Sequence, residues 1–301
     1  MVQPAYAVLA ERGVIEIAGA DRCAFLQGLI SNDVSKAAPD RAIHAALLTA
    51  QGRYLHDFFV IALGEALYLD AEAARLEELR RRLSLYKLRS KVTLAIASER
   101  FRVAVAWGTG ATAALGLPEQ PGAARQFAEG LVYVDPRLAA LGARALLPRE
   151  AGTEALAEAG LAQGDAAAYD RLRLSLGVPD GSRDLAVERT ILLEAGFDEL
   201  NGIDWQKGCY MGQELTARTK YRALIKKRLL PVAVEGKLPP PGTPVMLGDA
   251  EAGELRSGRD GLALALLRLE AVEAAAKTGG ALTAGEARLT PHRPEWLKLP
   301  Q

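Results

Sequence analysis

Residues 42–71, AIHAALLTAQGRYLHDFFVIALGEALYLDA, contain three short apolar runs. Gln51-Gly52 separates the first run from the second, and Gly64-Glu65 separates the second from the third. Apolar runs of this length, bounded by turns that contain glycine, are typical of β-strands. We therefore predict three consecutive strands here, and the rest of the N-terminal fold is organised around them.

Helical patterns flank these strands on both sides. After them, residues 70–92 form an amphipathic pattern whose core-facing residues are predicted to be Leu76, Leu79, Leu83 and Tyr86. Before them, residues 13–35 predict a strand, a turn and a helix capped by Asp21. Cys23, Leu26 and Ile30 recur at spacings of three and four, which places them on one helical face and predicts that Cys23 is a core residue.

The remaining chain predicts a second αβ section followed by an all-β tail. Strands and helices alternate again over residues 93–179, and residues 180–225 are less regular. Short strands broken by Gly and Pro turns then fill residues 227–301, a pattern typical of a small barrel. We predict an αβ region at 1–226, made of two interleaved subdomains divided near 95–100, and a separate C-terminal barrel domain.

The composition is that of an ordinary soluble protein. The 301 residues include 37 Lys and Arg, 37 Asp and Glu, and only two Cys, so we expect a reducing compartment and no disulfide framework. The sequence shows no targeting pattern, and no apolar run reaches the roughly 18 to 20 residues of a membrane span. We therefore expect a soluble protein of a bacterial-type cytoplasm.

Residues 205–228 carry a local excess of positive charge. The cations are Lys207, Arg218, Lys220, Arg222, Lys226, Lys227 and Arg228, against the single acid Glu214. Such a run is either a solvated basic face or a site for an anionic ligand or partner. It lacks the interleaved aromatic residues of a stacking platform, which argues against nucleic acid as a partner.

Two other kinds of ligand site are not supported. Three His and two Cys form no metal-ligand spacing, so we expect no permanent metal site. Residues 101–116 carry a Gly108-x-Gly110-x-x-Ala113 turn that roughly fits a dinucleotide-binding fingerprint. Because Gly116 cuts the following helix short and no further βαβ unit follows, we expect an ordinary tight turn.

The stretch KGCYMGQE, residues 207–214, sets Cys209 in an unusual environment. Nearby cations such as Lys207 would favour the thiolate form, and Gly208 and Gly212 would allow a tight turn or a positive φ. A nucleophile would need a base, and no His lies nearby in the sequence. Residue chemistry alone leaves structural and reactive roles for Cys209 equally supported.

Two carboxylates lie in apolar surroundings. Asp57 interrupts the hydrophobic run GRYLHDFFVIAL, and Glu194 follows three apolar residues in TILLEAGF. A buried carboxylate is costly unless it is paired, so each requires a cation, hydrogen-bond donors or a ligand. A capped turn or a local ion pair would satisfy either of them equally well.

Several segments together resemble the YgfZ-type folate-binding proteins of iron–sulfur cluster assembly, which are similar to the aminomethyltransferase (T protein) of the glycine cleavage system. The segments are LEAGFDELNGIDW with KGCYMGQELTART, FLQGLISNDVS, LLTAQGRYLHDFFV, YDRLRLSLGVPDG and the C-terminal stretch from GTPV to PEW. They span nearly the whole chain. The resemblance implies an α+β, aminomethyltransferase-like fold, with ferredoxin-like αβ subdomains and a C-terminal β-barrel arranged around a central folate pocket.

The same resemblance implies the site residues. The expected cofactor is tetrahydrofolate, held by Glu194, Asp57, His44, Asp70, Lys227 and Arg228. Glu194 would accept two parallel N–H bonds from the pterin, and Asp57 would contact the reacting nitrogen. His44 and Asp70 depart from the Tyr and Asn of the transferase pocket, and the basic run through Lys226 to Arg228 would face the glutamate tail. The reactive groups would be Cys209, Lys207 and Asp57, in a motif that also matches the family at Gly208, Tyr210, Gly212, Gln213, Glu214 and Arg218.

Two functions are compatible with this resemblance. The favoured one is a tetrahydrofolate-binding accessory factor for assembly or repair of 4Fe-4S clusters, with client enzymes or cluster-assembly proteins as partners. The alternative is an enzyme, a tetrahydrofolate-dependent one-carbon (aminomethyl) transferase that retains Asp57 as its polar group. Cys209 favours the accessory factor, because the transferase lacks this cysteine.

Overall fold

The chain forms two compact units that interleave in sequence. The computed structural model describes residues 3–150, 152–221 and 225–298. The first unit is drawn from Met1–Thr49, Leu55–Tyr169 and Leu200–Met211, and the second from Ala50–Tyr54, Asp170–Glu199 and Gly212–Gln301. The predicted boundary between residues 226 and 227 stays a prediction, although a barrel strand does begin at Lys227.

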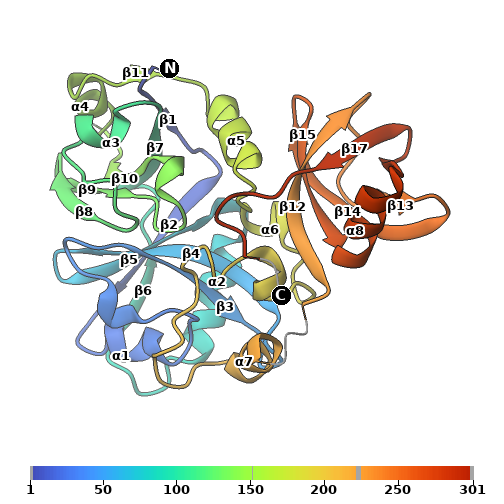
Figure 1. Ribbon diagram of the computed structural model, residues 1–301. Helices are drawn as coiled ribbons and strands as arrows, with labels where there is room; N and C mark the ends of the chain where they lie inside the picture. Colours follow the sequence, from blue (N-terminus) through green and yellow to red (C-terminus); the bar gives the residue numbers. More distant parts are fainter. Residues whose placement is uncertain (1–2, 151, 222–224, 299–301) are drawn as a thin grey trace. The chain divides into compact units, whose positions relative to one another are not determined.

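The three predicted strands are confirmed, and they form one side of a five-stranded sheet (Figure 1). Its strands, in spatial order, are β3 (Ile43–Leu48), β4 (Tyr54–Leu63), β5 (Ala66–Glu72), β2 (Arg12–Ala18) and β6 (Thr93–Ile96). β3 is buried along its whole length, and so are most residues of β4 and β5. Gly64, with φ of +59°, makes the tight turn between β4 and β5, a conformation that glycine adopts at little cost.

The helices beside this sheet confirm some of the predicted core and correct the rest. They are α1 (Arg22–Gln27), η1 (Val34–Lys36), η2 (Ala73–Arg75) and α2 (Leu76–Leu85). Leu76, Leu79 and Leu83 are buried as predicted, whereas Tyr86 lies beyond the end of α2 and is 43% exposed.

The predictions for the first helix were wrong at two residues. Cys23 is exposed, whereas Leu26 and Ile30 are fully buried. The helix α1 has only six residues, so Ile30 lies beyond its end and the predicted helical face does not form. Asp21 makes no side-chain capping bond, since its carboxylate accepts instead from the backbone N–H of Lys91 at 2.7 Å.

The second αβ section of the first unit is a six-stranded sheet. Its strands, in spatial order, are β11 (Ala162–Gln163), β1 (Ala5–Val8), β7 (Phe101–Trp107), β10 (Ala143–Pro148), β9 (Gly130–Val134) and β8 (Ala124–Phe127). The short helices of this section are α3 (Ala111–Ala114), η3 (Ala139–Leu141) and α4 (Gly152–Glu158). β7 pairs antiparallel with both of its neighbours, so the Gly108–Ala113 turn does not lie in a parallel dinucleotide-binding unit.

The predicted C-terminal barrel is confirmed in the second unit (Figure 1). It closes in the order β12 (Lys227–Glu235), β15 (Leu262–Arg268), β14 (Ala250–Arg259), β13 (Pro244–Leu247), β16 (Leu282–Ala284) and β17 (Ala287–Pro291), with α8 (Leu269–Thr278) after β15. Alternate apolar residues such as Val232, Leu255 and Leu267 fill its interior. Because the barrel is closed, its sheet has no open edge with unpaired backbone groups.

Shorter helices complete the second unit. They are α6 (Gly181–Asp184), η4 (Leu192–Ala195) and α7 (Gln213–Tyr221), and α5 (Ala166–Ser175) leads into the unit from the first. The buried Arg173 guanidinium bonds to Asp170 at 2.7 Å, Asp184 at 2.6 Å and Ser257 at 2.7 Å, which ties α6 to barrel strand β14. Within the described ranges, no helix is both long enough and apolar enough to cross a bilayer.

Candidate functional site

The cysteine loop of the first unit is held by Lys207. This side chain is buried, and its Nζ donates to the backbone carbonyls of Gln27 at 2.8 Å, Ile30 at 2.6 Å and Asn32 at 2.8 Å. The carbonyls at the end of a helix lack partners within it, so an ammonium is a suitable donor at the end of α1. Burial lowers the pKa of Lys207 to about 8, opposed by the nearby carboxylates of Asp33 and Asp204.

Lys207, which was predicted to be a reactive group that favours the thiolate of Cys209, therefore has a structural role. All three ammonium protons are used by carbonyls, and the Nζ also lies 5.1 Å from the centre of the Tyr210 ring. Tyr210 is buried, whereas Cys209 is an exposed free thiol. The loop is thus fastened by residues on both sides of Cys209, and its thiol faces solvent.

The two motif glycines behave differently from each other. Gly212 has φ of +82° and confirms the predicted left-handed turn. Gly208 has no positive φ, and a Cβ there would meet no atom within 4 Å, so neither conformation nor space requires glycine at this position. The tight turn therefore lies after Cys209.

The rest of the motif belongs to the second unit, on α7. Glu214 and Arg218 form an ion pair with each other one helical turn apart, and Glu214 is largely exposed. Such a surface pair contributes only about 0.3–0.5 kcal/mol to helix stability. Gln213 begins the same helix. The structure thus gives Glu214 and Arg218 each other as partners.

A buried histidine–carboxylate pair lies on adjacent strands of the first unit. His44 on β3 and Asp57 on β4 are 1% and 6% exposed, and His44 Nε2 lies 3.2 Å from Asp57 Oδ2. Burial disfavours the imidazolium and lowers the pKa of His44, although Asp57 opposes this effect. The partner that Asp57 was predicted to require is therefore a neutral histidine.

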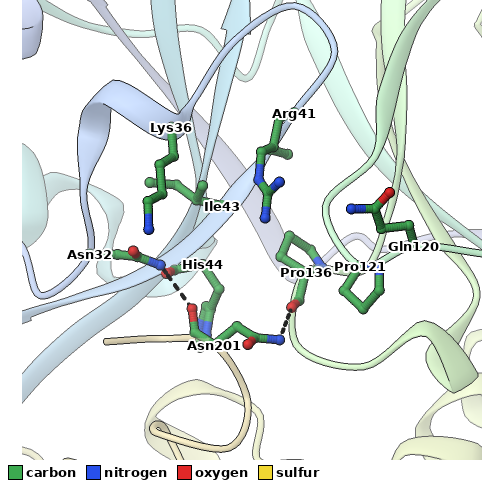
Figure 2. Close-up of a pocket in the computed structure, with 10 residues that line it drawn as sticks. Asn32, Lys36, Arg41, Ile43, His44, Gln120, Pro121, Pro136 and Asn201 are labelled. Carbon is green, nitrogen blue, oxygen red and sulfur yellow. Dashed lines mark hydrogen bonds between the residues drawn. The ribbon is translucent and has the colours of Figure 1, made fainter. Parts of the chain in front are cut away.

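A cavity of about 290 Å³ opens beside His44 (Figure 2). Its lining residues are Asn32, Lys36, Arg41, Ala42, Ile43, His44, Gln120, Pro121, Pro136 and Asn201. Asn32 Nδ2 donates to the carbonyls of His44 and Asn201, both at 2.8 Å, and Asn201 Nδ2 donates to the Pro136 carbonyl at 3.0 Å. These bonds fix the inner wall of what we call the first-unit pocket.

Two cations stand at the first-unit pocket. Lys36 pairs with Asp204 at 2.5 Å, and its side chain is 49% exposed. Arg41 is exposed and, among the described residues, has no acidic partner. Of the lining residues, only His44 was predicted from the sequence. The others come from four separated segments, and no local pattern announces that these segments meet.

Asp70, which was predicted to line the folate pocket, is instead a structural anion. It is fully buried, accepts from Arg12 Nε at 2.6 Å and Arg144 Nη2 at 2.7 Å, and does not line the first-unit pocket. Burial alone would raise the pKa of Asp70, but the two guanidiniums lower it. Its two oxygens are occupied, which explains why a carboxylate is tolerated in the sheet.

The arginine partner of Asp70 belongs to a stack around Phe59. Arg144, Arg137 and Arg12 lie 4.1, 4.9 and 5.8 Å from the ring centre of Phe59. Asp135 accepts from Arg137 at 2.8 Å, so the buried cations are also balanced by acids. The only sign of this network in the sequence is the presence of charged residues within apolar segments. Of its members, the sequence analysis named only Asp70.

A second pocket lies in the second unit around Glu194. This cavity of about 190 Å³ is lined by Arg53, Ala186, Arg189, Thr190, Glu194, Lys227, Arg256 and Leu266. Burial raises the pKa of Glu194, and the positive charges of Lys227 and Arg53 oppose the rise. Two of the predicted cofactor residues, Glu194 and Lys227, therefore share one cavity, which we call the second-unit pocket.

Arg228, predicted to face a folate tail, is engaged elsewhere. It is 3% exposed and donates to Glu199 at 2.7 Å, to the Lys298 carbonyl at 2.7 Å and to the Leu193 carbonyl. A guanidinium buried among these acceptors is a structural contact, so the predicted role does not fit.

Three cations of the basic run are paired with acids. Lys220 pairs with Asp198 at 3.1 Å, in addition to the pairs of Arg218 and Arg228 already described. Arg222 lies outside the described residues. Within the described ranges, no group of three or more His, Cys, Asp and Glu is arranged to hold a metal ion.

Comparison with known proteins agrees with this architecture. Residues 226–299 match the model of the CAF17 C-terminal beta-barrel domain. The iron-sulfur cluster assembly factor IBA57, mitochondrial, of Mus musculus is 34% identical over 283 residues, covering 87% of this chain and 77% of the relative. The Homo sapiens protein of the same name is 34% identical over 281 residues, with the same two coverages of 87% and 77%.

The fold likeness extends to an aminomethyltransferase. The crystal structure of the glycine cleavage system aminomethyltransferase T from Bartonella henselae aligns with a TM-score of 0.77 at 16% identity, covering 98% of this chain and 87% of the enzyme. The predicted aminomethyltransferase-like α+β fold with a C-terminal barrel is therefore confirmed. An identity of 16% extends this likeness to the fold alone.

The predicted cytoplasmic location is wrong by the same comparison. Both mammalian relatives are named as mitochondrial proteins, and so is the Neurospora crassa relative, which is 30% identical over 240 residues and is covered over 54% of its length. The prediction rested on composition and on the first residues, and neither is specific to a compartment.

Proposed function

This chain belongs to the IBA57 family of iron–sulfur cluster assembly factors, and we propose from that premise that it serves the assembly or repair of 4Fe-4S clusters in client enzymes. The observation that carries the proposal is the exposed Cys209 thiol on a loop clamped by Lys207. The clamp limits the freedom of the loop, so the thiol is presented in one place. A cluster is the cargo in this role.

The thiol needs ligands from another molecule to hold a cluster. A 4Fe-4S cluster takes four thiolates, and the chain has only two cysteines, Cys23 and Cys209. We therefore propose a transient contact in which Cys209 meets a cluster or a thiol that a cluster-assembly protein carries. The mitochondrial relatives make the cluster-assembly proteins of that compartment the first partners to test.

The surroundings of Cys209 support a protein partner. The Tyr86 hydroxyl lies 3.2 Å from Met211 Sδ, which joins the cysteine loop to the segment after α2. Leu85, the last residue of α2, is 68% exposed, and Leu88 in the segment after it is 88% exposed. Grouped apolar side chains left in water beside a reactive group are a common feature of interaction surfaces.

Complementation of a strain that lacks its own factor tests the proposal. Cys209→Ala is expected to remove rescue of a cluster-dependent enzyme activity while the variant remains folded, because the thiol is exposed. Cys23→Ala is the matched control, since this second cysteine is also exposed and free. Rescue by Cys209→Ala at the wild-type level would contradict the proposal and return the thiol to a passive role.

We further propose that the protein binds tetrahydrofolate. The supporting observation is the carboxylate of Glu194 among the cations of the second-unit pocket. Glu194 would accept two parallel N–H bonds from a pterin. Calorimetry is expected to give a micromolar affinity, on the order of −8 kcal/mol. A folded protein that gives no heat with tetrahydrofolate would rule this out.

A one-carbon transferase is the second candidate, favoured by the buried Asp57. A carboxylate held by a neutral histidine could orient a folate nitrogen or act on its proton. Asp57→Asn separates the two functions. Under the transferase alternative it abolishes one-carbon transfer, and Cys209→Ala leaves transfer unchanged. Under the favoured function no transfer is detected in the wild type.

A further inference from the structure

We infer that the surface around Cys209 docks an acidic protein that carries the iron–sulfur cluster. This surface, which we call the thiol face, is formed by residues 21–28, 85–91 and 207–211, and all three segments belong to the first unit. The inference rests on the proposed function and names the kind of partner that the Cys209 site receives.

Hydrogen bonds join the three segments of the thiol face to one another. The backbone N–H of Met211 donates to the Gly28 carbonyl at 3.1 Å, and the Tyr86 hydroxyl lies 3.2 Å from Met211 Sδ. The backbone N–H of Lys91 donates to the Asp21 carboxylate at 2.7 Å. Segments far apart in the sequence therefore form one continuous surface, and the cysteine loop is part of it.

The thiol face exposes large apolar side chains beside small residues. Leu85, Tyr86 and Leu88 are 68%, 43% and 88% exposed. On the neighbouring segment, Ala24 and Gly28 are exposed as well. Apolar side chains are stabilised when a partner covers them, and small residues allow that partner to approach closely.

Leu88 has a backbone conformation that is unfavourable for leucine. Its φ of +41° lies in the left-handed region, where a Cβ atom is crowded by the following carbonyl. Its side chain is also almost entirely in water, so burial within the chain does not offset this cost. Glycine or asparagine would adopt the same conformation more readily. A leucine that is both strained and exposed indicates a contact with another molecule.

The charge of the thiol face is complementary to an acidic surface. Its cations Arg22, Lys87, Arg89 and Lys91 are at least partly exposed, and among the described residues they have no acidic partner. Asp21 is the only acid in the sequence of the three segments. Opposite charges speed the encounter of two proteins and select the correct partner. The face therefore favours a partner with an excess of Asp and Glu.

An anionic membrane surface also attracts cations that lie beside apolar side chains. The position of Cys209 within the thiol face favours a protein instead. A cluster or a thiol that meets Cys209 is carried by a protein, whereas a lipid headgroup offers this thiol no ligand.

Substitutions in the thiol face test the inference in the complementation assay. Lys87→Glu combined with Arg89→Glu should lower rescue by about tenfold at limiting expression, because like charges then face each other. Leu88→Asn should lower rescue to a similar extent without loss of stability, since asparagine tolerates the left-handed conformation. Lys277→Glu combined with Arg288→Glu reverses one exposed Lys and one exposed Arg of the second unit. It is the matched control and should rescue as the wild type does.

Thiol reactivity separates docking from the chemistry of Cys209. In a Cys23→Ala background, Cys209 is the only cysteine that reacts with iodoacetamide. Its rate of alkylation should be the same with and without Leu88→Asn. A slower alkylation in Leu88→Asn would mean that Leu88 acts on the thiol itself, and it would overturn the inference.

A photo-reactive residue identifies the class of partner. p-Benzoylphenylalanine placed at position 88, in cells of the complemented strain, should cross-link an acidic protein that binds iron through cysteine, whereas at position 277 it should not. The reversal of Lys87 and Arg89 should weaken this product by about tenfold. A basic partner, or a product that charge reversal leaves unchanged, would contradict the inference.

The remaining outcomes separate the inference from the proposed function. Rescue by both thiol-face variants at the wild-type level, while Cys209→Ala fails, would overturn the inference only. Rescue by Cys209→Ala would overturn both. Vesicles of phosphatidylglycerol and phosphatidylcholine test the membrane alternative by sedimentation. If charge reversal abolishes co-sedimentation and no protein is cross-linked at position 88, the face binds a membrane and the partner assignment is wrong.

Discussion

The two pockets hold titratable groups that burial drives in opposite directions along the pH scale. Burial lowers the pKa of His44 in the first unit and raises the pKa of Glu194 in the second. In both cases the neutral form is favoured, because charge is costly away from water. At low pH His44 therefore becomes charged and Glu194 becomes neutral. Acid thus destabilises the surroundings of His44 in the first unit and removes the cost of a buried charge at Glu194 in the second.

The difference shows what each pocket is suited to recognise. Arg41 carries the unbalanced charge of the first-unit pocket, because Lys36 is paired with Asp204, and the buried His44–Asp57 pair adds no imidazolium, so the pocket attracts anions. The second-unit pocket contains the Glu194 carboxylate among cations. The carboxylate can accept hydrogen bonds from a ligand, and the surrounding cations compensate its charge. Substitution of His44 or Glu194 should therefore change ligand binding or the pH dependence of stability.

The largest effect is expected from Glu194→Ala, because it removes the acceptor of two ligand N–H bonds. Charge-assisted hydrogen bonds contribute roughly 1.5–3 kcal/mol each, so tetrahydrofolate affinity should fall by about 100-fold or more. Calorimetry measures the loss. Glu235→Ala, a change at an exposed glutamate of β12, is the control and should bind as the wild type does. Unchanged binding by Glu194→Ala would remove Glu194 from the ligand site.

The next effect concerns acid stability. A buried histidine with a lowered pKa takes up its proton less readily in the folded state, so stability falls as pH drops below about 6.5, the ordinary value. Each unit of difference between folded and unfolded pKa corresponds to about 1.4 kcal/mol. His44→Gln should flatten the fall in denaturant titrations between pH 7 and pH 5.

A second histidine limits how much His44→Gln can flatten that fall. His56 is also buried, and burial lowers its pKa to about 4, so its contribution has the same sign and remains in the variant. The double variant His44→Gln, His56→Gln should flatten the fall further. A pH profile of His44→Gln that matches the wild type would show that His44 is protonated equally in both states.

The smallest effect is a gain in stability from Glu194→Gln. A carboxyl whose folded pKa is raised contributes stability at low pH and loses it as pH rises through the folded pKa. Glutamine has no charge to desolvate, so the variant should be more stable than the wild type at pH 7, and this gain should shrink as the pH falls toward 4 and the wild-type carboxyl becomes neutral. Urea unfolding at the two pH values measures this. A loss of stability at pH 7 would mean that the cations around Glu194 outweigh its burial.

The local parts of this fold were predictable, and the contacts that define the sites were not. The strands of residues 42–71 and the barrel follow from apolar runs and turn residues, which act over a few positions. The need of Asp57 for a partner was also visible, because a carboxylate in an apolar strand requires one. That the partner is a neutral histidine depends on which strands become neighbours.

The KGCYMGQE stretch shows most clearly what could not be predicted from the sequence. Charge counting placed Lys207 beside Cys209 as a source of positive field, yet its ammonium is fully occupied by carbonyls of the Gln27–Asn32 segment. Arg228 was likewise counted as available, although Glu199 and two carbonyls hold it. Proximity in sequence identifies neighbours along the backbone, whereas the direction of a long side chain is decided by acceptors far away in the chain.

The clamp on the cysteine loop also sets an order of events during synthesis of the chain. Gln27, whose carbonyl accepts from Lys207, precedes that lysine by 180 residues. At about 5–20 residues per second, the end of α1 is made roughly 10 to 35 seconds before its cation. Until then these carbonyls depend on water, and Cys209 gains its fixed position only when Lys207 closes this long-range contact. The Cys209 thiol is thus among the last features of the first unit to take its position, after the strands of both of its sheets have been synthesised.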